Sequence, residues 1–264
     1  MMFRMAIVLL ICVFSVRAEV AVAPRVYESG FSIVIKLGGE LYAALPCNFS
    51  RQVDSQAISL QTQDLPVVAP ISTTEDQRPV RQVCLSAGFI DMVNHICHAK
   101  AIERIEPGYF DRYVRNLAEL SVGNPQAPAP NIANPRYWKD DIMDDQLSYF
   151  NQVIGFITAV NLSHHYLGHY AKYAANLTTP GDALMPINKF LTTDEWDCSI
   201  RAGAVDALDC ALSTDGPRAF FEAIDRMPRR PTWVAYVVPE RVDLKRLNKQ
   251  LAMYETEFFR GQLK

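Results

Sequence analysis

The feature of this sequence that most constrains its fold is a long helical pattern from about residue 145 to 176. Asp144 and Asp145 stand at its start, where carboxylates complement the dipole of a helix. Its apolar residues recur three or four positions apart: Leu147, Phe150, Val153, Ile154, Ile157 and Val160. A helix with so broad an apolar face must be covered by other elements, so we expect it to be central and mostly buried.

The rest of the chain mixes strand and helix patterns. Residues 31–37 (FSIVIKL) alternate, are rich in β-branched side chains and end at a Gly-Gly pair, which predicts a strand followed by a turn. Short strands are also expected at 80–85 and 232–238, with residues 50–77 forming loops and at most short strands. Helices are expected over 87–106, 109–120, 194–212, 217–226 and 242–260. The pattern predicts an α+β protein, dominated by helices, with a small edge sheet and a central helix.

The first 18 residues have the pattern of a secretory signal peptide. Arg4 precedes an apolar run over 6–16, and the small residues around Ala18 favour cleavage after it. The run is shorter than the roughly 20 residues that span a bilayer, and no later segment is long and apolar enough to do so. We therefore expect an exported chain, periplasmic or secreted. Residues 19–264 are expected to form one domain, with a Pro-rich insertion loop around 123–138.

Charge and cysteine content narrow the function classes. The 264 residues include 26 Lys and Arg against 29 Asp and Glu, so a basic surface that follows nucleic-acid phosphates is not expected. No two cysteines form a CxxC pair, which disfavours both a zinc-thiolate knuckle and a thioredoxin-type redox site. Cys12 leaves with the leader. The five that remain are Cys47, Cys84, Cys97, Cys198 and Cys210.

Residues 163–170 (SHHYLGHY) hold three of the five histidines of the chain. On a continuous helix, four residues turn by about 400°, so His165 and His169 face the same side, one turn apart. Their imidazoles can then converge on one metal ion, whereas His164 points about 100° away from them. The spacing therefore predicts a metal site on the central helix.

A zinc hydrolase needs a third protein ligand and a general base near the metal-bound water. Glu195, early in the helix expected over 194–212, is the best third ligand, and Asp194 and Asp197 are the alternatives. Asp194 is also a candidate N-cap of that helix. His95 and His98 are spaced three apart, and we interpret them as partly buried, hydrogen-bonded histidines rather than as ligands of a second metal or of the first.

Three segments, taken in order, resemble the gluzincin metallopeptidases, in particular the HtpX-like and CAAX-prenyl-protease-like branch. Residues 83–91 (VCLSAGFID) are similar to that family's edge strand and following helix, residues 165–169 (HYLGH) to its HExxH helix, and residues 195–198 (EWDC) to its Glu-helix. The resemblance covers about the middle half of the chain. It implies a zincin-like fold, a zinc ion held by His165, His169 and Glu195, and a peptide or protein as substrate or partner.

Two residues depart from the family pattern. Tyr166 stands where the family has its general-base Glu, and Ser199 stands where an Asp supports the Glu ligand. Loss of a general base lowers a rate by about 10² to 10⁴-fold. The resemblance therefore implies an exported metallopeptidase-like protein with weak or no peptidase activity. The alternatives are a non-catalytic envelope binding or assembly protein that keeps the fold without metal, and an all-helical envelope protein whose histidines are unrelated to zinc.

Overall fold

The computed structural model describes residues 26–117, 119–120, 123–124, 126–178 and 183–263. The expected signal peptide, residues 1–18, lies outside the described residues. Helices dominate and are joined by one small sheet, so the α+β, helix-dominated fold class is confirmed.

Helices and strands follow one another along the chain, with α for α-helices, η for 3-10 helices and β for strands. In chain order they are α1 (Val26–Ala44), α2 (Cys47–Ser50), β1 (Ile58–Gln61), β2 (Val68–Glu75), β3 (Arg78–Ser86), α3 (Ala87–Ile102), α4 (Tyr109–Arg115), η1 (Pro135–Trp138), α5 (Asp140–Tyr166), α6 (His169–Tyr173), η2 (Ala174–Asn176), η3 (Ile187–Lys189), α7 (Thr193–Asp209), α8 (Asp215–Arg226), η4 (Thr232–Tyr236) and α9 (Leu244–Phe259).

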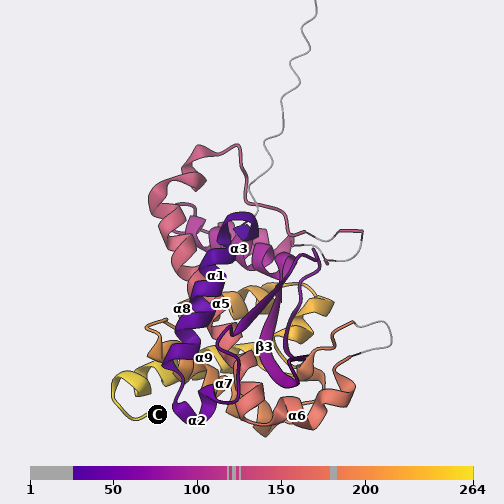
Figure 1. The fold of residues 1–264 in the computed structure, drawn as a ribbon. Coiled ribbons are helices and arrows are strands. Elements are labelled where there is room, and N and C mark those ends of the chain that lie inside the picture. Colours follow the sequence, from indigo (N-terminus) through magenta and orange to yellow (C-terminus); the bar gives the residue numbers. More distant parts are fainter. Residues whose placement is uncertain (1–25, 118, 121–122, 125, 179–182, 264) are drawn as a thin grey trace, which may run out of the picture.

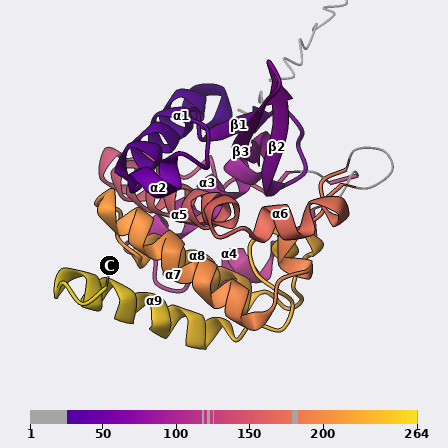
Figure 2. The ribbon, with the colours of Figure 1, turned by 60° about the horizontal axis from the view of Figure 1, so that its bottom comes forward.

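Helix α5 is the central element of the fold. It contacts α1, α3, α7, α8 and both β2 and β3, and every residue from Val153 to Tyr166 is buried. Figure 2 shows α1 and the sheet on one side of α5, with α7 and then α9 on the other. The broad apolar face predicted from the sequence is therefore covered from several directions, as expected for a helix of this pattern.

The sheet has the strand order β1-β3-β2. Strand β3 pairs in parallel with β1, where Ile58 is opposite Val83, and antiparallel with β2, where Val68 is opposite Leu85. The β2–β3 hairpin turns at Asp76 and Gln77, whose φ angles of 46° and 64° match the left-handed conformation of a tight hairpin turn.

Ser86 ends β3 and is also the N-cap of α3. Its hydroxyl accepts hydrogen bonds from the backbone N–H groups of Phe89 at 3.1 Å and Val67 at 2.8 Å. The same hydroxyl donates to the carbonyl of Leu65 at 2.7 Å. One buried side chain thus fixes the sheet, the helix that follows it and the 65–67 segment against one another.

Two of the expected strands are wrong. Residues 31–37 lie inside α1, where Val34, Leu37 and Leu41 are spaced for a helix and are buried in the core. Packing of that helical face outweighs the weak strand preference of β-branched residues. Residues 232–236 form η4 rather than a strand, because Pro231 precedes a tight turn that packs Trp233 and Val234 into the core.

Other predicted elements are confirmed with small shifts of their ends. The 80–85 strand lies within β3, and the helices α3, α4, α8 and α9 fall within the expected ranges or within two residues of them. β1 and β2 occupy part of the segment expected to be mostly loops, and β2 is longer than expected.

The Pro-rich loop is held to the core by two histidines. His95 Nδ1 lies 3.1 Å from the carbonyl oxygen of Ala127, and His98 Nε2 lies 2.7 Å from that of Tyr137 in η1. Both histidines are buried. The prediction that His95 and His98 are hydrogen-bonded is confirmed, and both are more deeply buried than the partial burial expected.

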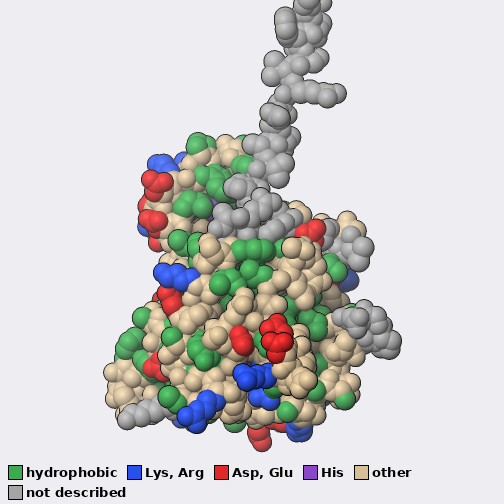
Figure 3. Space-filling view, in the orientation of Figure 1, with side chains coloured by type: hydrophobic (Ala, Val, Ile, Leu, Met, Phe, Trp, Pro, Cys, Tyr) green, Lys and Arg blue, Asp and Glu red, His purple; other side chains and the backbone are tan. Residues whose placement is uncertain are grey.

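The surface mixes its charges. On the face shown in Figure 3, basic and acidic side chains lie among apolar ones, without a continuous basic stripe. Within the part of the chain that the structure describes, no helix has the length and hydrophobicity needed to cross a membrane.

Candidate functional site

The His-rich segment is not one continuous helix. Helix α5 ends at Tyr166, Gly168 has a φ of 81°, and α6 begins at His169. A left-handed residue ends a helix, and glycine adopts this conformation without the strain of a Cβ atom. The prediction that His165 and His169 lie on one helix, one turn apart, is wrong.

The break brings His164, rather than His165, to His169. Their Nδ1 atoms are 3.2 Å apart, and Ser199 Oγ of α7 lies 3.2 Å from Nδ1 of His164 and 3.1 Å from Nδ1 of His169. The hydroxyl donates to the carbonyl of Glu195 at 2.8 Å, so it accepts from an imidazole N–H. All three side chains are buried.

The contact between the two Nδ1 atoms requires that at least one of the two histidines is neutral. One imidazole donates through Nδ1–H while Nδ1 of the other accepts, because two Nδ1–H groups facing each other at this distance would repel. Burial lowers the pKa of His164 to about 3 and also lowers the pKa of His169. We refer to His164, His169 and Ser199 as the buried His–His–Ser cluster.

His165 points to the sheet instead. Its Nε2 lies 3.0 Å from the carbonyl oxygen of Gln82 in β3, and its ring packs 4.8 Å from that of Tyr170. A carbonyl only accepts, so Nε2 carries the proton. Burial lowers the pKa of His165 to about 4, although the Gln82 carbonyl opposes this shift. His165 therefore links α5 to β3 and does not face His169.

Glu195 is already occupied by other partners. Its carboxylate accepts hydrogen bonds from Lys172 Nζ at 2.7 Å, Tyr173 Oη at 2.9 Å and the backbone N–H of Thr192 at 2.9 Å. Thr192 is the N-cap of α7 and forms a capping box with Glu195, so the expectation that Asp194 caps this helix is wrong. The hydrogen bond from Lys172 is the main reason that the pKa of Glu195 is lowered to about 2.

Tyr166 is turned toward α7. Its hydroxyl donates to Asp206 Oδ2 at 2.6 Å, and its ring stacks on that of Phe49 with centroids 4.2 Å apart. Burial raises the pKa of the Tyr166 phenol far above its ordinary value of 10. Tyr166, which stands where the resembled family has its general-base Glu, is thus bonded to a carboxylate of α7.

The arrangement does not fit the zinc site implied by the resemblance. His165, His169 and Glu195 have three separate sets of partners, and no group of three or more His, Cys, Asp and Glu side chains among the described residues is placed to hold a metal ion. A catalytic zinc site needs three such ligands and an open position. The zinc ion implied by the resemblance stays a prediction.

The described cysteines form neither a disulfide nor part of a metal-binding group. All five described cysteines are free thiols. Cys84 and Cys97 are buried, and burial raises the pKa of the Cys84 thiol to about 12. A buried thiol of this kind is unreactive because the reactive form is the thiolate.

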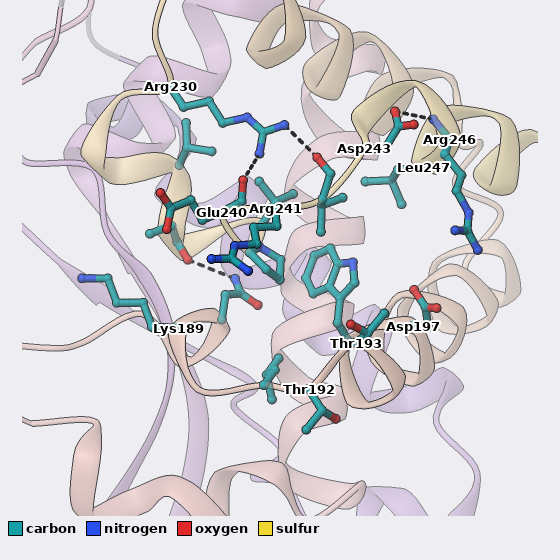
Figure 4. Close-up of a pocket in the computed structure, with 18 of the residues that line it drawn as sticks. Lys189, Thr192, Thr193, Asp197, Arg230, Glu240, Arg241, Asp243, Arg246 and Leu247 are labelled. Carbon is teal, nitrogen blue, oxygen red and sulfur yellow. Dashed lines mark hydrogen bonds between the residues drawn. The ribbon is translucent and has the colours of Figure 1, made fainter.

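A large groove opens on another side of α7. It has a volume of about 900 Å³ and lies between η3, the first turn of α7, η4 and the start of α9. Its apolar lining includes Trp196, Val234, Val238 and Leu247, which are buried. Figure 4 shows charged side chains around this lining, among them Lys189, Arg241 and Arg246.

Arg230 holds one wall of the groove in shape. Its guanidinium donates to the backbone carbonyls of Glu240 at 2.6 Å and Val242 at 2.7 Å. Asp243 accepts from the backbone N–H groups of Lys245 and Arg246 and so caps α9. Arg230 and Asp243 are thus engaged by the backbone, whereas Lys189, Arg241 and Arg246 make no ion pair with any residue that the structure describes.

Sequence reasoning found the histidines but not the groove. Its lining residues come from two stretches of the chain, 188–197 and 230–250, and no local pattern shows that they lie side by side. The signal that was present is Trp196, a single large aromatic residue inside the polar first turn of a helix. Asp197, an alternative ligand predicted from the sequence, lines the groove rather than approaching a histidine pair.

No family model, no curated protein and no solved structure matches this chain.

Proposed function

We propose that this chain is an exported, non-catalytic binding protein that holds an extended peptide segment in the groove beside Trp196. The preferred segment carries an aliphatic side chain next to a carboxylate. The observation that carries the proposal is an apolar groove with three exposed cations, Lys189, Arg241 and Arg246, that have no acidic partner among the described residues.

The histidine segment supports a structural role rather than a catalytic one. The buried His–His–Ser cluster uses its own donors and acceptors, and Ser199 gives its proton to the carbonyl of Glu195. The nearest candidate acid, Glu195, is held by Lys172 and Tyr173. A general base must reach the proton that it abstracts, and neither Tyr166 nor Glu195 has a free hydrogen-bonding atom directed at the histidines.

The groove matches a peptide in size and chemistry. A volume of about 900 Å³ is near the upper end of the range of ligand pockets, so it accommodates several residues. Leu191 and Val242, which are half-buried in the groove lining, offer apolar surface for an aliphatic side chain, and burial of such a group supplies about 1.5–3 kcal/mol. Arg241 and Arg246 supply hydrogen-bond donors for a carboxylate of the peptide. Asp197 and Glu240 lie at the same rim, and their negative charges disfavour peptides with several consecutive acidic residues.

The experiment measures binding of a fluorescein-labelled octapeptide, Gly-Ser-Glu-Leu-Glu-Leu-Ser-Gly, to the full chain by fluorescence anisotropy. The comparison peptide has Lys in place of both Glu. We expect the acidic peptide to bind at least about tenfold more tightly, and its affinity to fall as salt is raised from 50 to 300 mM, because the rim charges are exposed.

The matched variants are Arg241→Glu with Arg246→Glu in the groove and Arg78→Glu in the β2–β3 hairpin, which is also exposed. The groove variant is expected to weaken binding of the acidic peptide on the order of tenfold, and the hairpin variant to leave it unchanged. Equal affinities for the two peptides, or cleavage of either one by the wild type, would overturn the proposal.

A further inference from the structure

A second cavity lies on the opposite end of α7 from the groove. It has a volume of about 640 Å³ and is walled by α2, the end of α5, one face of α7 and the end of α9. Figure 1 shows α2, α7 and α9 near one another at the end of the molecule where the C-terminus lies. The volume lies within the range of small-molecule sites.

The walls are aromatic and aliphatic. Phe49, Tyr166 and Phe258 line the cavity, and the first two of these rings are stacked on each other. Leu167, Val205 and Leu263 add aliphatic surface. Such a lining favours a compact apolar ligand body, and the faces of the rings attract a positive charge.

Two carboxylates face this cavity from successive turns of α7. Asp206 is 6% exposed, and its hydrogen bond from Tyr166 Oη supplies no positive charge. Asp209 is exposed at the mouth of the same cavity. Neither makes an ion pair with a residue of the described part of the chain. A carboxylate that is more than nine-tenths buried, beside aromatic rings and without a cation, is costly unless a cation reaches it.

We propose that this cavity binds a small organic ammonium compound, with the cation beside Asp206 and the half-buried ring of Phe49 and its apolar body against Phe258. The proposal concerns a site separate from the peptide groove and does not depend on the proposed function.

The charged and titratable neighbours of Asp206 are consistent with a cation site. Asp209, Cys210 and Glu40 of α1 are all acidic or neutral groups that interact with this end of α7. Arg201 also lines the cavity, five residues before Asp206. Five residues correspond to about 7.5 Å along a helix and to a rotation of about 140°, so Arg201 lies toward the other end of the site.

The test is isothermal titration calorimetry of the full chain at pH 7.5 with benzyltrimethylammonium chloride. Benzyl alcohol and phenylacetate serve as the neutral and anionic counterparts with the same ring. We expect the cation to bind at least about tenfold more tightly than benzyl alcohol, and we expect phenylacetate not to bind. Nα-acetyl-lysine N-methylamide, which keeps the side-chain ammonium group, represents a lysine side chain of a protein. We expect it to bind more weakly than benzyltrimethylammonium.

Variants assign the binding to this cavity. Asp206→Asn keeps an acceptor for Tyr166 and is expected to lower the affinity for the cation about tenfold. Phe49→Leu is expected to lower this affinity about two- to fivefold. Asp209→Asn removes an exposed carboxylate at the mouth, so it tests the same charge effect even if Asp206→Asn folds poorly. Glu75→Gln in the exposed hairpin is the matched control. Equal binding of benzyl alcohol and the cation, or no change in both aspartate variants, would refute the ammonium site.

Discussion

Tyr166 of α5 and Asp206 of α7 are joined by a 2.6 Å hydrogen bond in which the phenol is the donor. Both side chains are buried, and the bond crosses the contact between the two helices. The residue that stands in the position of a catalytic Glu in the resembled family is therefore part of a helix–helix contact in this chain.

This contact predicts the outcome of two substitutions at Tyr166. Tyr166→Glu places a second carboxylate beside Asp206, so we expect a loss of several kcal/mol in the free energy of unfolding and no gain of peptidase activity. Tyr166→Phe removes only the donor and is expected to lose about 1–3 kcal/mol. Urea unfolding and a peptidase assay with casein measure both. Peptidase activity in a folded Tyr166→Glu variant would restore the metallopeptidase interpretation.

The buried His–His–Ser cluster predicts how a metal site can be created. Ser199→Cys is nearly isosteric and adds a thiolate to His164 and His169, which completes a three-ligand group. We expect 1 mM ZnCl₂ to raise the melting temperature of this variant by several degrees and to have no such effect on the wild type. Ser148→Cys, on the exposed side of α5, is the control. Stoichiometric zinc in purified wild-type protein would contradict this prediction and support the ligands predicted from the sequence.

Acid is expected to destabilise the fold through its histidines. An unfolded histidine takes up a proton near pH 6.5, whereas burial holds the pKa of His165 at about 4 and that of His164 at about 3 in the folded chain. Stability is therefore fully present above pH 6.5. Below that value each histidine removes about 1.4 kcal/mol per pH unit from the free energy of unfolding, until its folded pKa is reached.

The raised pKa of Asp206 has the opposite effect on the pH dependence of stability. Burial raises its pKa from 3.8 to about 6, so between these values the folded chain binds the proton and gains stability as the pH falls. Two histidines outweigh one carboxyl, and we expect the free energy of unfolding to fall between pH 6.5 and 4.5. Urea unfolding at four pH values measures it, and Asp206→Asn should make the fall steeper. A constant free energy over this range would show that the histidines are solvated.

The contact between α5 and α7 depends on Gly203. A Cβ atom at this position would lie 2.7 Å from the backbone nitrogen of Val160 and 2.9 Å from its Cα. Backbone atoms of a central helix cannot move aside, so Gly203→Ala is expected to lower the free energy of unfolding by about 2–3 kcal/mol. Gly39→Ala in α1 is the control, because nothing lies within 4 Å of its added Cβ. That variant should be stabilised by about 0.5–1 kcal/mol.

The sequence indicated the central helix and the dominance of helices because those depend on an apolar period that a single chain displays. The short strand expected over 80–85 likewise lies within β3. Residues 31–37 misled because Ile33, Val34 and Ile35 in succession favour a strand locally. The buried helical spacing of Val34, Leu37 and Leu41 is completed only beyond that window, at Leu41.

The candidate site was predicted only in part, and the reason is one residue. The spacing of His165 and His169 indicates a shared face only if the helix continues through Gly168, which adopts a positive φ instead. The turn at Gly168 moves His169 onto the face of His164, and no periodicity argument includes such a turn. The groove and the ammonium cavity join residues from distant segments, so they follow from the tertiary fold and not from any local pattern.

The hydroxyl of Ser86 couples the local unfolding of two neighbouring elements. The amide protons of Val67 and Phe89, 22 positions apart in the chain, are both held by that one oxygen atom. Neither can be released to solvent without disturbing the other, so hydrogen exchange at these two amides is expected to follow one opening event. The start of β2 and the start of α3 then behave as a single unit of local unfolding, although one is a strand and the other a helix.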